Sequence, residues 1–594
     1  MSYRPDIDGL RATAVVAVIL CHAGIHSFSG GYVGVDIFFV ISGFLITSII
    51  KRDMMEANFS LGRFYERRAR RILPALILVT AATVPLAWLL MFPHFFLNFA
   101  QSIVATLLFS NNLLLASTGG YWDLEADLKP FLHTWSLGVE EQFYVVFPII
   151  MIVLWAMGRS WQLSTMALLC VASFIAAEIG RHLSPSTNYF LSTSRAWELL
   201  VGCLAAYVPI RPRKFDNALS FAGLAAILAS IVLFDENTPS PSPYILLPVL
   251  GAAAILLFSR SGTIAYRVLS FPVCVGIGLI SYSAYLWHQP IFALSRVASL
   301  EPPKPLLMTG LALLSFGLGL LSWKYVEQPF RNDRNVPLQK LVSIGLPVYL
   351  VMIALGLLAH INNGFPSHTF PKGGDDVRNY AQYNARVFKY RTQSFPNNDL
   401  ANVLVVGNSV GRDAANVLIE GAILESETNL AYWPTIPEDL CPRRSELEKL
   451  AAEADFIIIP IAPGGSNILA ISQGVDCVRS ISRAEIVIFG PKHFGANINP
   501  YASVSHYERQ HARSKVRPDD VAYNSKLKEI FSGQTYIDLL DLLGPDGKKV
   551  SVFDSDGNPL TADRIHLTRY GAVFVAKRFF AAHPALARRL RLSP

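Results

Sequence analysis

Long apolar runs separated by short polar loops dominate the first 360 residues of the chain. A run of about 17 to 25 apolar residues is long enough to cross a bilayer as a helix. Such runs predict eleven spans, at 10–27, 33–50, 72–92, 142–158, 162–178, 196–210, 215–233, 245–260, 270–293, 305–326 and 342–360. The pattern therefore predicts a multi-pass α-helical membrane domain.

A further apolar run, 98–116, carries amide and hydroxyl side chains that are costly against lipid, among them Gln101, Ser102, Asn111 and Asn112. We therefore predict that this run is interfacial or re-entrant. With eleven spans and a cytoplasmic amino terminus, most Lys and Arg residues of the loops lie on the cytoplasmic side, as the positive-inside rule requires. A twelfth span would move every later loop to the other side and remove much of this bias.

Beyond residue 360 the pattern changes to short apolar runs that alternate with longer mixed segments. Strands are predicted at 402–406, 456–461, 485–489 and 535–538, and helices at 411–425, 444–454 and 521–533. This alternation is typical of an α/β domain with a parallel sheet. Because the number of spans is odd, we expect the domain to be extracytoplasmic, in the periplasm or outside the cell, and the spans to lie in the cytoplasmic (inner) membrane.

The predicted division is a membrane domain over 1–335, an additional transmembrane helix in 336–365, a linker or extension over 366–400 and the extracytoplasmic domain over 401–594. Composition agrees, since 52% of the residues are apolar and only 16% are charged, which excludes one ordinary soluble domain. Positive charge is clustered beside the spans, so we expect a lipid bilayer and no nucleic acid as partner. The sequence does not fix the oligomeric state.

The cysteines contain no C-x-x-C pair, which gives no indication of a zinc or redox site. Cys441 and Cys477 fall in the domain that is predicted to face an oxidising compartment. We therefore expect that these two residues can form a disulfide.

Two ionisable residues share one face of the first span. Arg11 and His22 are eleven residues apart, which is close to three helical turns and about 16 Å. The tight connection at 27–31 makes the first two spans antiparallel and brings Asp36 level with His22. Because a carboxylate fixes and activates an imidazole, this pair predicts a general base or acyl relay. The ordinary alternative is side chains that are satisfied locally at the membrane boundaries.

Four arginines crowd the start of the third span: Arg67, Arg68, Arg70 and Arg71. Guanidinium groups bind phosphate oxygens in pairs, so the cluster predicts a cytoplasmic site for a polyphosphorylated donor, with no metal. The chain has neither a Walker loop nor a GxGxxG motif, so ATP and NAD are not indicated. The alternative is a cluster that only fixes topology.

A polar and aromatic group lies just outside the fourth predicted span: His133, Trp135, Glu140 and Glu141. Carboxylates and an indole face suit a carbohydrate, so we predict that this group binds the acceptor. The alternative is an interfacial aromatic belt with acids at the start of a helix.

In this order the motifs resemble acyltransferase family 3. The resemblance covers about the first 330 residues and rests on segments 8–12, 34–44, 64–71, 133–144 and 285–288, together with the Arg-x10-His spacing that ends at His22. It implies transfer of an acetyl group from cytoplasmic acetyl-CoA across the membrane to an extracytoplasmic sugar. Arg11 and His22 fall on the family's Arg-x10-His motif, and the arginine cluster contains its Arg-x-x-Arg motif in two registers.

Two motifs in the soluble domain carry hydrolase chemistry. Ser409 follows a predicted strand at a turn into a polar helix, where backbone N–H groups are unpaired. Asp563 and His566 are three residues apart, so one can orient the other. In this order the motifs resemble the SGNH hydrolase fold, which implies Ser409 as the nucleophile, His566 as the base, Asp563 as its orienting acid and Asn467 as an oxyanion donor.

Two positions depart from the SGNH pattern. Asn408 stands where that family has an acid, so we expect the turn to survive with a changed local charge. The glycine of the second block is missing. Taken alone, a serine that caps a helix and a solvated Asp/His pair are the common explanations of these motifs.

The combined hypothesis is an O-acetyltransferase that modifies a cell-surface glycan. The resemblance favours a lipopolysaccharide side chain as the acceptor, and other surface polysaccharides and peptidoglycan stay open. One alternative is a membrane-anchored carbohydrate acetyl-esterase whose membrane part is a transporter or scaffold. The other is a noncatalytic glycan-binding domain on the same membrane part.

Overall fold

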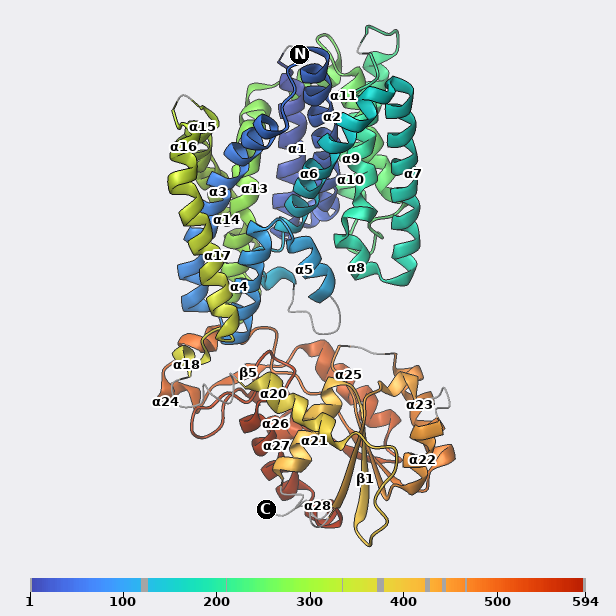
Figure 1. The fold of residues 1–594 in the computed structure, drawn as a ribbon. Helices are drawn as coiled ribbons and strands as arrows, with labels where there is room; N and C mark the ends of the chain where they lie inside the picture. Colours follow the sequence, from blue (N-terminus) through green and yellow to red (C-terminus); the bar gives the residue numbers. More distant parts are fainter. Residues whose placement is uncertain are drawn as a thin grey trace. The chain divides into compact units, whose positions relative to one another are not determined.

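The computed structural model describes residues 3–118, 126–209, 211–333, 335–370, 379–421, 428–440, 445–464 and 467–590. The chain divides into two compact units (Figure 1). The first comprises Met1–Trp88, Asn98–Arg296 and Pro302–Leu358, and the second comprises Leu89–Leu97, Val297–Glu301 and Ala359–Pro594.

Long helices that run side by side build the first unit (Figure 1). They are α1 (Pro5–His22), α2 (Gly34–Met55), α3 (Leu61–Leu90), α4 (Pro93–Leu107), α6 (Thr134–Met157), α7 (Arg159–Leu183), α9 (Ser192–Ala205), α10 (Asp216–Leu233), α11 (Leu246–Phe258), α13 (Pro272–Val297), α14 (Pro305–Ser322) and α17 (Leu346–Ile361). Shorter helices are α5 (Asn111–Thr118), α8 (Pro185–Phe190), α12 (Ile264–Leu269), α15 (Gln328–Arg331) and α16 (Leu338–Lys340).

Seven helical segments of the described residues are long and apolar enough to cross a membrane. They are His26–Met55, Leu61–Leu90, Thr134–Met157, Arg159–Leu183, Asp216–Leu233, Pro305–Arg331 and Leu338–Ile361. The prediction of a membrane region with several apolar helices is therefore confirmed. The count of eleven spans stays a prediction.

The run 98–116 does not form one continuous helix. It contains the end of α4 and most of α5, which are separated at Phe109, where φ is 52°. Asn111 and Asn112 are fully buried, and the Asn111 amide donates to the Phe131 carbonyl at 2.8 Å. The polar side chains that are costly against lipid therefore bind protein groups instead.

Two glycines bring α2 and α9 into close contact. A Cβ atom on Gly43 would lie 1.9 Å from the Leu199 carbonyl oxygen, and one on Gly202 would lie 2.1 Å from that of Val40. Small residues permit such close approach between membrane helices. The contact holds buried ionic side chains of the two helices together.

The second unit is an α/β domain around a five-stranded parallel sheet. Its strands are β1 (Ala401–Val406), β2 (Thr428–Trp433), β3 (Phe456–Pro460), β4 (Glu485–Phe489) and β6 (Thr535–Ile537), in the order β2-β1-β3-β4-β6. A small antiparallel pair joins β5 (Arg513–Lys515) to β7 (Lys549–Ser551). The strand order reverses between β1 and β3, and ligands of open α/β sheets bind at such a point.

Helices α21 (Ser409–Glu420), α22 (Ser445–Glu453), α23 (Ile468–Ile481), α25 (Pro518–Ile530), α26 (Leu539–Leu543), α27 (Arg569–Ala582) and α28 (Pro584–Arg589) accompany the sheet. The predicted parallel sheet is confirmed, and β1, β3, β4 and β6 fall on the predicted runs. The sequence does not predict β2. This strand lies at the edge of the sheet and has half-buried positions, so it lacks a continuous apolar run.

Part of the segment predicted as a linker or extension is folded onto the second unit. It forms α20 (Tyr380–Ala385) and the helical turn Arg386–Tyr390. The Arg386 Nε atom donates to Asn416 of α21 at 2.9 Å, and Asn416 in turn donates to Asn384 at 3.3 Å. This part is therefore an extension of the domain and not a free spacer.

Cys477 is disulfide-bonded. Cys441, its expected partner, lies outside the described residues. The free cysteines of the described residues all belong to the first unit: Cys21, Cys170, Cys203 and Cys274.

Candidate functional sites

A cavity of about 150 Å³ lies among α1, α2, α3, α6 and α13 of the first unit. Arg11, Arg68 and Arg71 line it. Arg68 and Arg71 are three residues apart on α3 and so share one face of that helix. The structure thereby distinguishes the two registers of the Arg-x-x-Arg motif, because only this one lines the cavity.

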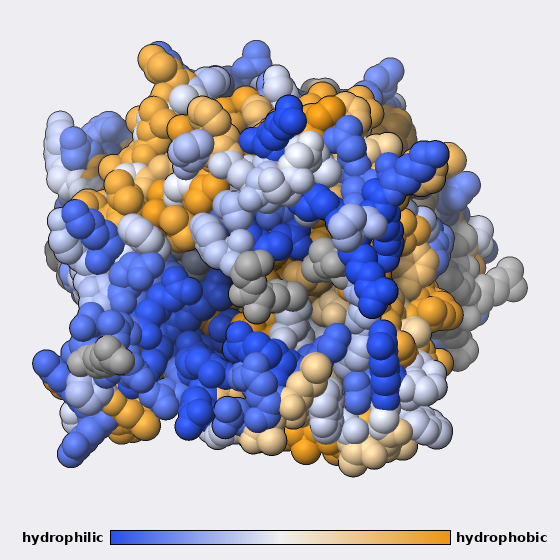
Figure 2. All heavy atoms as spheres, turned by 90° about the horizontal axis from the view of Figure 1, so that it is seen from above, coloured by the Kyte–Doolittle hydropathy of each residue, from blue (hydrophilic) through white to orange (hydrophobic). Residues whose placement is uncertain are grey.

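The other two arginines of the cluster form ion pairs with neighbouring acids. Arg67 lies 3.0 Å from Asp53, and Arg70 donates to Glu66 at 2.8 Å. The cluster therefore has one pair of arginines that lines the cavity and one pair that binds protein carboxylates. Figure 2 looks onto the end of the first unit that carries the N-terminus, and hydrophilic residues gather there in a broad patch.

Two carboxylates line the same cavity as the arginines. Glu140 accepts hydrogen bonds from the hydroxyls of Ser42 and Tyr144, and Glu141 is 7% exposed. Helix α6 begins at Thr134 and not at residue 142, so both acids lie inside the helix. The prediction that both acids lie outside the fourth span is therefore wrong, because the helix begins eight residues before residue 142.

Trp135 is buried among aromatic side chains, with 5% of its surface exposed. Its ring centroid lies 4.9 Å from Tyr189, 5.8 Å from Phe190 and 6.2 Å from Phe39. The indole therefore does not present the open face that stacking on a sugar requires.

Asp36 does not contact His22. It is fully buried and lies 3.0 Å from Arg195 of α9, which also binds Glu198 at 2.9 Å. The predicted pairing of His22 with Asp36 is wrong, because the close contact of α2 with α9 brings this carboxylate to a guanidinium instead.

The buried carboxylates of Asp36 and Glu198 share the guanidinium of Arg195. We expect Arg195→Met to lower the free energy of unfolding by about 3–5 kcal/mol, because it leaves two buried acids without a counter-charge. Thermal unfolding of the detergent-purified protein measures this loss as a lower Tm. The control Arg181→Met removes a solvent-accessible, half-buried ion pair with Glu178 and should leave Tm nearly unchanged. Equal Tm values for the two variants would contradict a stabilising role.

His22 contacts a second imidazole. Its Nδ1 atom lies 2.9 Å from Nε2 of His288, and the two rings are stacked with centroids 5.1 Å apart. His288 Nδ1 lies 2.5 Å from the Tyr285 carbonyl oxygen, which can only accept a hydrogen bond. Neutral His288 therefore carries its proton on Nδ1, and His22 donates from Nδ1 to it. The Nε2 atom of His22 is then left as a free base.

A third imidazole lies beside this pair. The ring centroid of His133 is 5.1 Å from that of His288, and its side chain is 1% exposed. The Tyr285 hydroxyl lies 2.8 Å from the His133 carbonyl oxygen and 2.7 Å from Ser136. Tyr285 and Ser136 also line the arginine cavity, so two side chains of the cavity wall lie beside the histidine cluster, although none of the three imidazoles lines the cavity itself.

His288 was not predicted as a site residue, although its motif contributes to the family resemblance. The available signal was a histidine inside an apolar span, which is a functional candidate by default. Its partner His22 lies 266 residues away, so the pair itself could not be derived from spacing.

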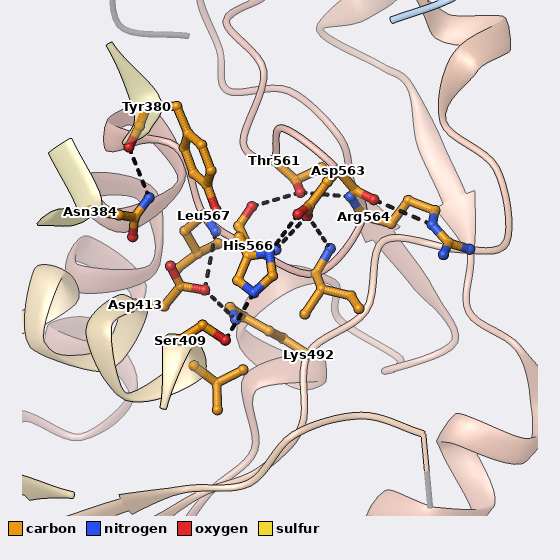
Figure 3. A network of polar contacts seen from close by, with 12 residues as sticks. Tyr380, Asn384, Ser409, Asp413, Lys492, Thr561, Asp563, Arg564, His566 and Leu567 are labelled. Carbon is orange, nitrogen blue, oxygen red and sulfur yellow. Dashed lines mark hydrogen bonds and ion pairs between the residues drawn. The ribbon is translucent and has the colours of Figure 1, made fainter. Parts of the chain in front are cut away.

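In the second unit, Ser409 and His566 meet across 157 residues of sequence (Figure 3). The His566 Nε2 atom lies 3.2 Å from Ser409 Oγ, and its Nδ1 atom lies 2.5 Å from Asp563 Oδ2. Ser409 is the first residue of α21, which follows β1 at the carboxyl edge of the sheet. The residues predicted as nucleophile, base and orienting acid are therefore brought together at the point where the strand order reverses.

The turn 563–566 fixes the imidazole. Asp563 Oδ1 accepts the backbone N–H groups of Ile565 and His566, both at 2.9 Å. Burial alone would raise the pKa of Asp563, but the charge and hydrogen bonds of His566 outweigh it and hold this pKa well below its usual range. Arg564 between them has φ of 100°, a left-handed conformation that stores strain at this site.

Two asparagines of the predicted site cap helices. The Asn408 side chain accepts the Val410 N–H at the start of α21, so the turn survives without the acid of the SGNH pattern. Asn467 accepts the N–H groups of Leu469 and Ala470 at the start of α23. Its oxyanion role stays a prediction, and the two residues before it lie outside the described residues.

Residues 4–324 match the model of a family described as an acyltransferase domain. The chain belongs to acyltransferase family 3. The cavity arginines and the histidine cluster all lie within the matched region. The Ser409 site lies outside it, and its SGNH assignment stays a prediction, since no solved structure matches the chain.

Relatives of this family 3 chain include the peptidoglycan O-acetyltransferase OatA of Listeria monocytogenes. It is 30% identical over 394 residues, which cover 60% of this chain and 63% of OatA. YrhL of Bacillus subtilis is 29% identical over 395 residues, which cover 60% of this chain and 62% of YrhL. SAS0844 of Staphylococcus aureus is 31% identical over 356 residues, which cover 56% of this chain and 58% of SAS0844. The alignments thus span less than two thirds of each relative.

Proposed function

We propose that the protein is an O-acetyltransferase that moves acetyl from cytoplasmic acetyl-CoA across the membrane to a hydroxyl group of a cell-surface glycan. The observation that carries this proposal is the cavity lined by Arg11, Arg68 and Arg71, whose wall residue Tyr285 donates to the His133 carbonyl of the histidine cluster. Guanidinium groups suit the phosphates of acetyl-CoA. The name of the relative OatA supports a cell-wall glycan as the acceptor.

The first transfer takes place at His22. Its Nε2 atom attacks the thioester carbonyl carbon, the C–S bond breaks and coenzyme A leaves as the thiolate. His288 Nε2 accepts the proton from Nδ1 of His22, so the acetyl-imidazole stays neutral. The 2.9 Å contact between the rings supports this proton transfer.

The second transfer takes place at Ser409, on the extracytoplasmic side. The Ser409 Oγ atom attacks the acetyl carbon while His566 takes the Oγ proton, and the bond from that carbon to His22 Nε2 breaks, which gives an acetyl-serine. His288 returns its proton to His22 Nδ1, so both imidazoles are neutral again, and His566 releases its proton to water. A glycan hydroxyl then attacks this ester while His566 removes the hydroxyl proton, and that proton returns to Ser409 Oγ. Ionised Asp563 stabilises His566 while it carries the proton.

The donor site can be tested at the two cavity arginines. We expect Arg68→Gln and Arg71→Gln each to raise KM for acetyl-CoA about 10-fold, because each removes a charge-assisted hydrogen bond to phosphate. Inverted membrane vesicles that are supplied with radiolabelled acetyl-CoA provide the measurement. Arg67→Gln is the matched control, since Arg67 binds Asp53 outside the cavity. An equal KM in all three variants would contradict the donor site.

The acceptor can be identified by mass spectrometry of cell-surface glycans from cells with and without the protein. We expect O-acetyl groups to disappear from one class, either peptidoglycan or a lipopolysaccharide-type polysaccharide. Unchanged acetylation of every class would reject the transferase.

A second candidate function is suggested by the geometry at Ser409. A Ser-His-Asp arrangement also suits a membrane-anchored acetyl-esterase. The whole protein can be assayed on a chromogenic acetyl ester, with and without an added sugar. Hydrolysis that the sugar does not divert supports the esterase, whereas transfer to the sugar supports the transferase. Absence of both reactions with this ester supports a glycan-binding domain.

A further inference from the structure

A buried ion pair lies beneath the Ser409 site. Asp413 and Lys492 are joined at 2.7 Å, and their side chains are only 2% and 3% exposed (Figure 3). Lys492 comes from the segment that follows β4, whereas Asp413 belongs to α21. Burying two charges is costly, so such a pair persists where its geometry and further hydrogen bonds compensate.

Asp413 connects the helix of the nucleophile to the loop of the base. It stands four residues after Ser409 on α21, so both side chains project from the same face of the helix. Its Oδ2 atom accepts the backbone N–H of Leu567 at 3.2 Å. Leu567 directly follows His566, the residue whose ring must reach Ser409.

Hydrogen bonds therefore fix the backbone on both sides of His566 in the sequence. On the amino-terminal side, Asp563 binds the backbone N–H and the ring of His566. On the carboxyl-terminal side, Asp413 binds the N–H of Leu567. The His566 carbonyl also accepts the Thr561 hydroxyl at 2.7 Å. The Asp413 contact, like that of His566 with Ser409, joins this loop directly to the helix that carries Ser409.

We propose that Asp413 is a positioning residue that sets the distance between His566 and Ser409, and that Lys492 neutralises its buried charge. The inference rests on the proposed function, because it assumes that Ser409 is the nucleophile. Without the acceptor at residue 413 the loop of His566 can move relative to α21. A displacement of about 1 Å from reactive geometry can slow a reaction on the order of 100-fold.

Two double variants of the whole protein separate positioning from stability. Asp413→Ala with Lys492→Met removes both charges and also the acceptor for the Leu567 N–H. Asp413→Asn with Lys492→Met removes both charges but keeps a carbonyl oxygen as the acceptor. Neither double variant leaves a buried charge unpaired, so we expect both to fold with similar Tm.

The readout is the rate at which a fluorophosphonate labels Ser409 in detergent-purified protein. In this reaction Ser409 Oγ bonds to phosphorus, fluoride leaves and His566 takes the Oγ proton. We expect the asparagine double variant to react within about 3-fold of the unaltered protein and the alanine double variant about 10 to 100-fold more slowly. Glu420→Gln, on the same helix roughly 16 Å from Ser409, is the control and should react normally.

Equal labelling rates in the two double variants would overturn the positioning role and leave the proposed function intact. An unlabelled Ser409 in the unaltered protein would instead overturn the nucleophile assignment, and the inference with it.

Discussion

Ser409→Ala is expected to reduce glycan O-acetylation by at least ~10³-fold, because it removes the protein atom that the proposed mechanism acylates on the extracytoplasmic side. The same variant should lose labelling by a fluorophosphonate. The geometry supports this expectation, since Ser409 Oγ lies 3.2 Å from the imidazole that takes its proton. Mass spectrometry of the glycan from cells that carry the variant gives the measurement.

The control for this variant is Ser525→Ala. Ser525 donates to a backbone carbonyl on the exposed part of α25, so its loss should leave acetylation unchanged. Normal acetylation in Ser409→Ala would show that the domain binds the glycan without forming an acetyl-enzyme.

His22→Ala is expected to reduce transfer from acetyl-CoA by about 10³-fold, since it removes the group that receives the acetyl. His288→Phe should have a smaller effect, about 10²-fold, because it keeps the nucleophile but removes the acceptor of its Nδ1 proton. KM for acetyl-CoA should change little in both variants, because the arginines bind the donor. Radiolabel transfer in inverted vesicles measures both quantities.

His26→Ala is the matched control for these variants. His26 is exposed and lies one helical turn beyond His22 in sequence, so its loss should leave transfer unchanged. A His22→Ala protein that retains full transfer would reject the membrane half of the mechanism. Equal effects of His288→Phe and His26→Ala would remove His288 from it.

The pattern of apolar and polar residues predicted those helices and strands that are formed by one continuous stretch of sequence. Apolar runs are sufficient to predict the membrane helices and the buried strands, because each of these elements lies in a hydrophobic environment over its whole length. The strand β2 was missed because an edge strand is only partly buried. The meeting of Ser409 with His566 was predicted from motif order within a resemblance, since their separation in sequence carries no distance information.

Pairs of polar side chains within the membrane could not be predicted in this way. Asp36 was assigned to His22 because a tight turn joins their helices, yet its partner Arg195 comes from α9. The glycines that allow this contact, Gly43 and Gly202, mark a close approach only once the paired helices are known. The cavity face of the arginine cluster likewise depends on how α3 is rotated against its neighbours.

The central claim is that one acetyl group passes from the donor through His22 to Ser409. Isotope-labelled acetyl-CoA can be supplied to the cytoplasmic face of sealed vesicles without an acceptor, and the peptide that contains Ser409 can then be analysed by mass spectrometry. The account predicts labelled acetyl on Ser409 in the unaltered protein and none in His22→Ala. Equal labelling of Ser409 in both proteins would contradict it.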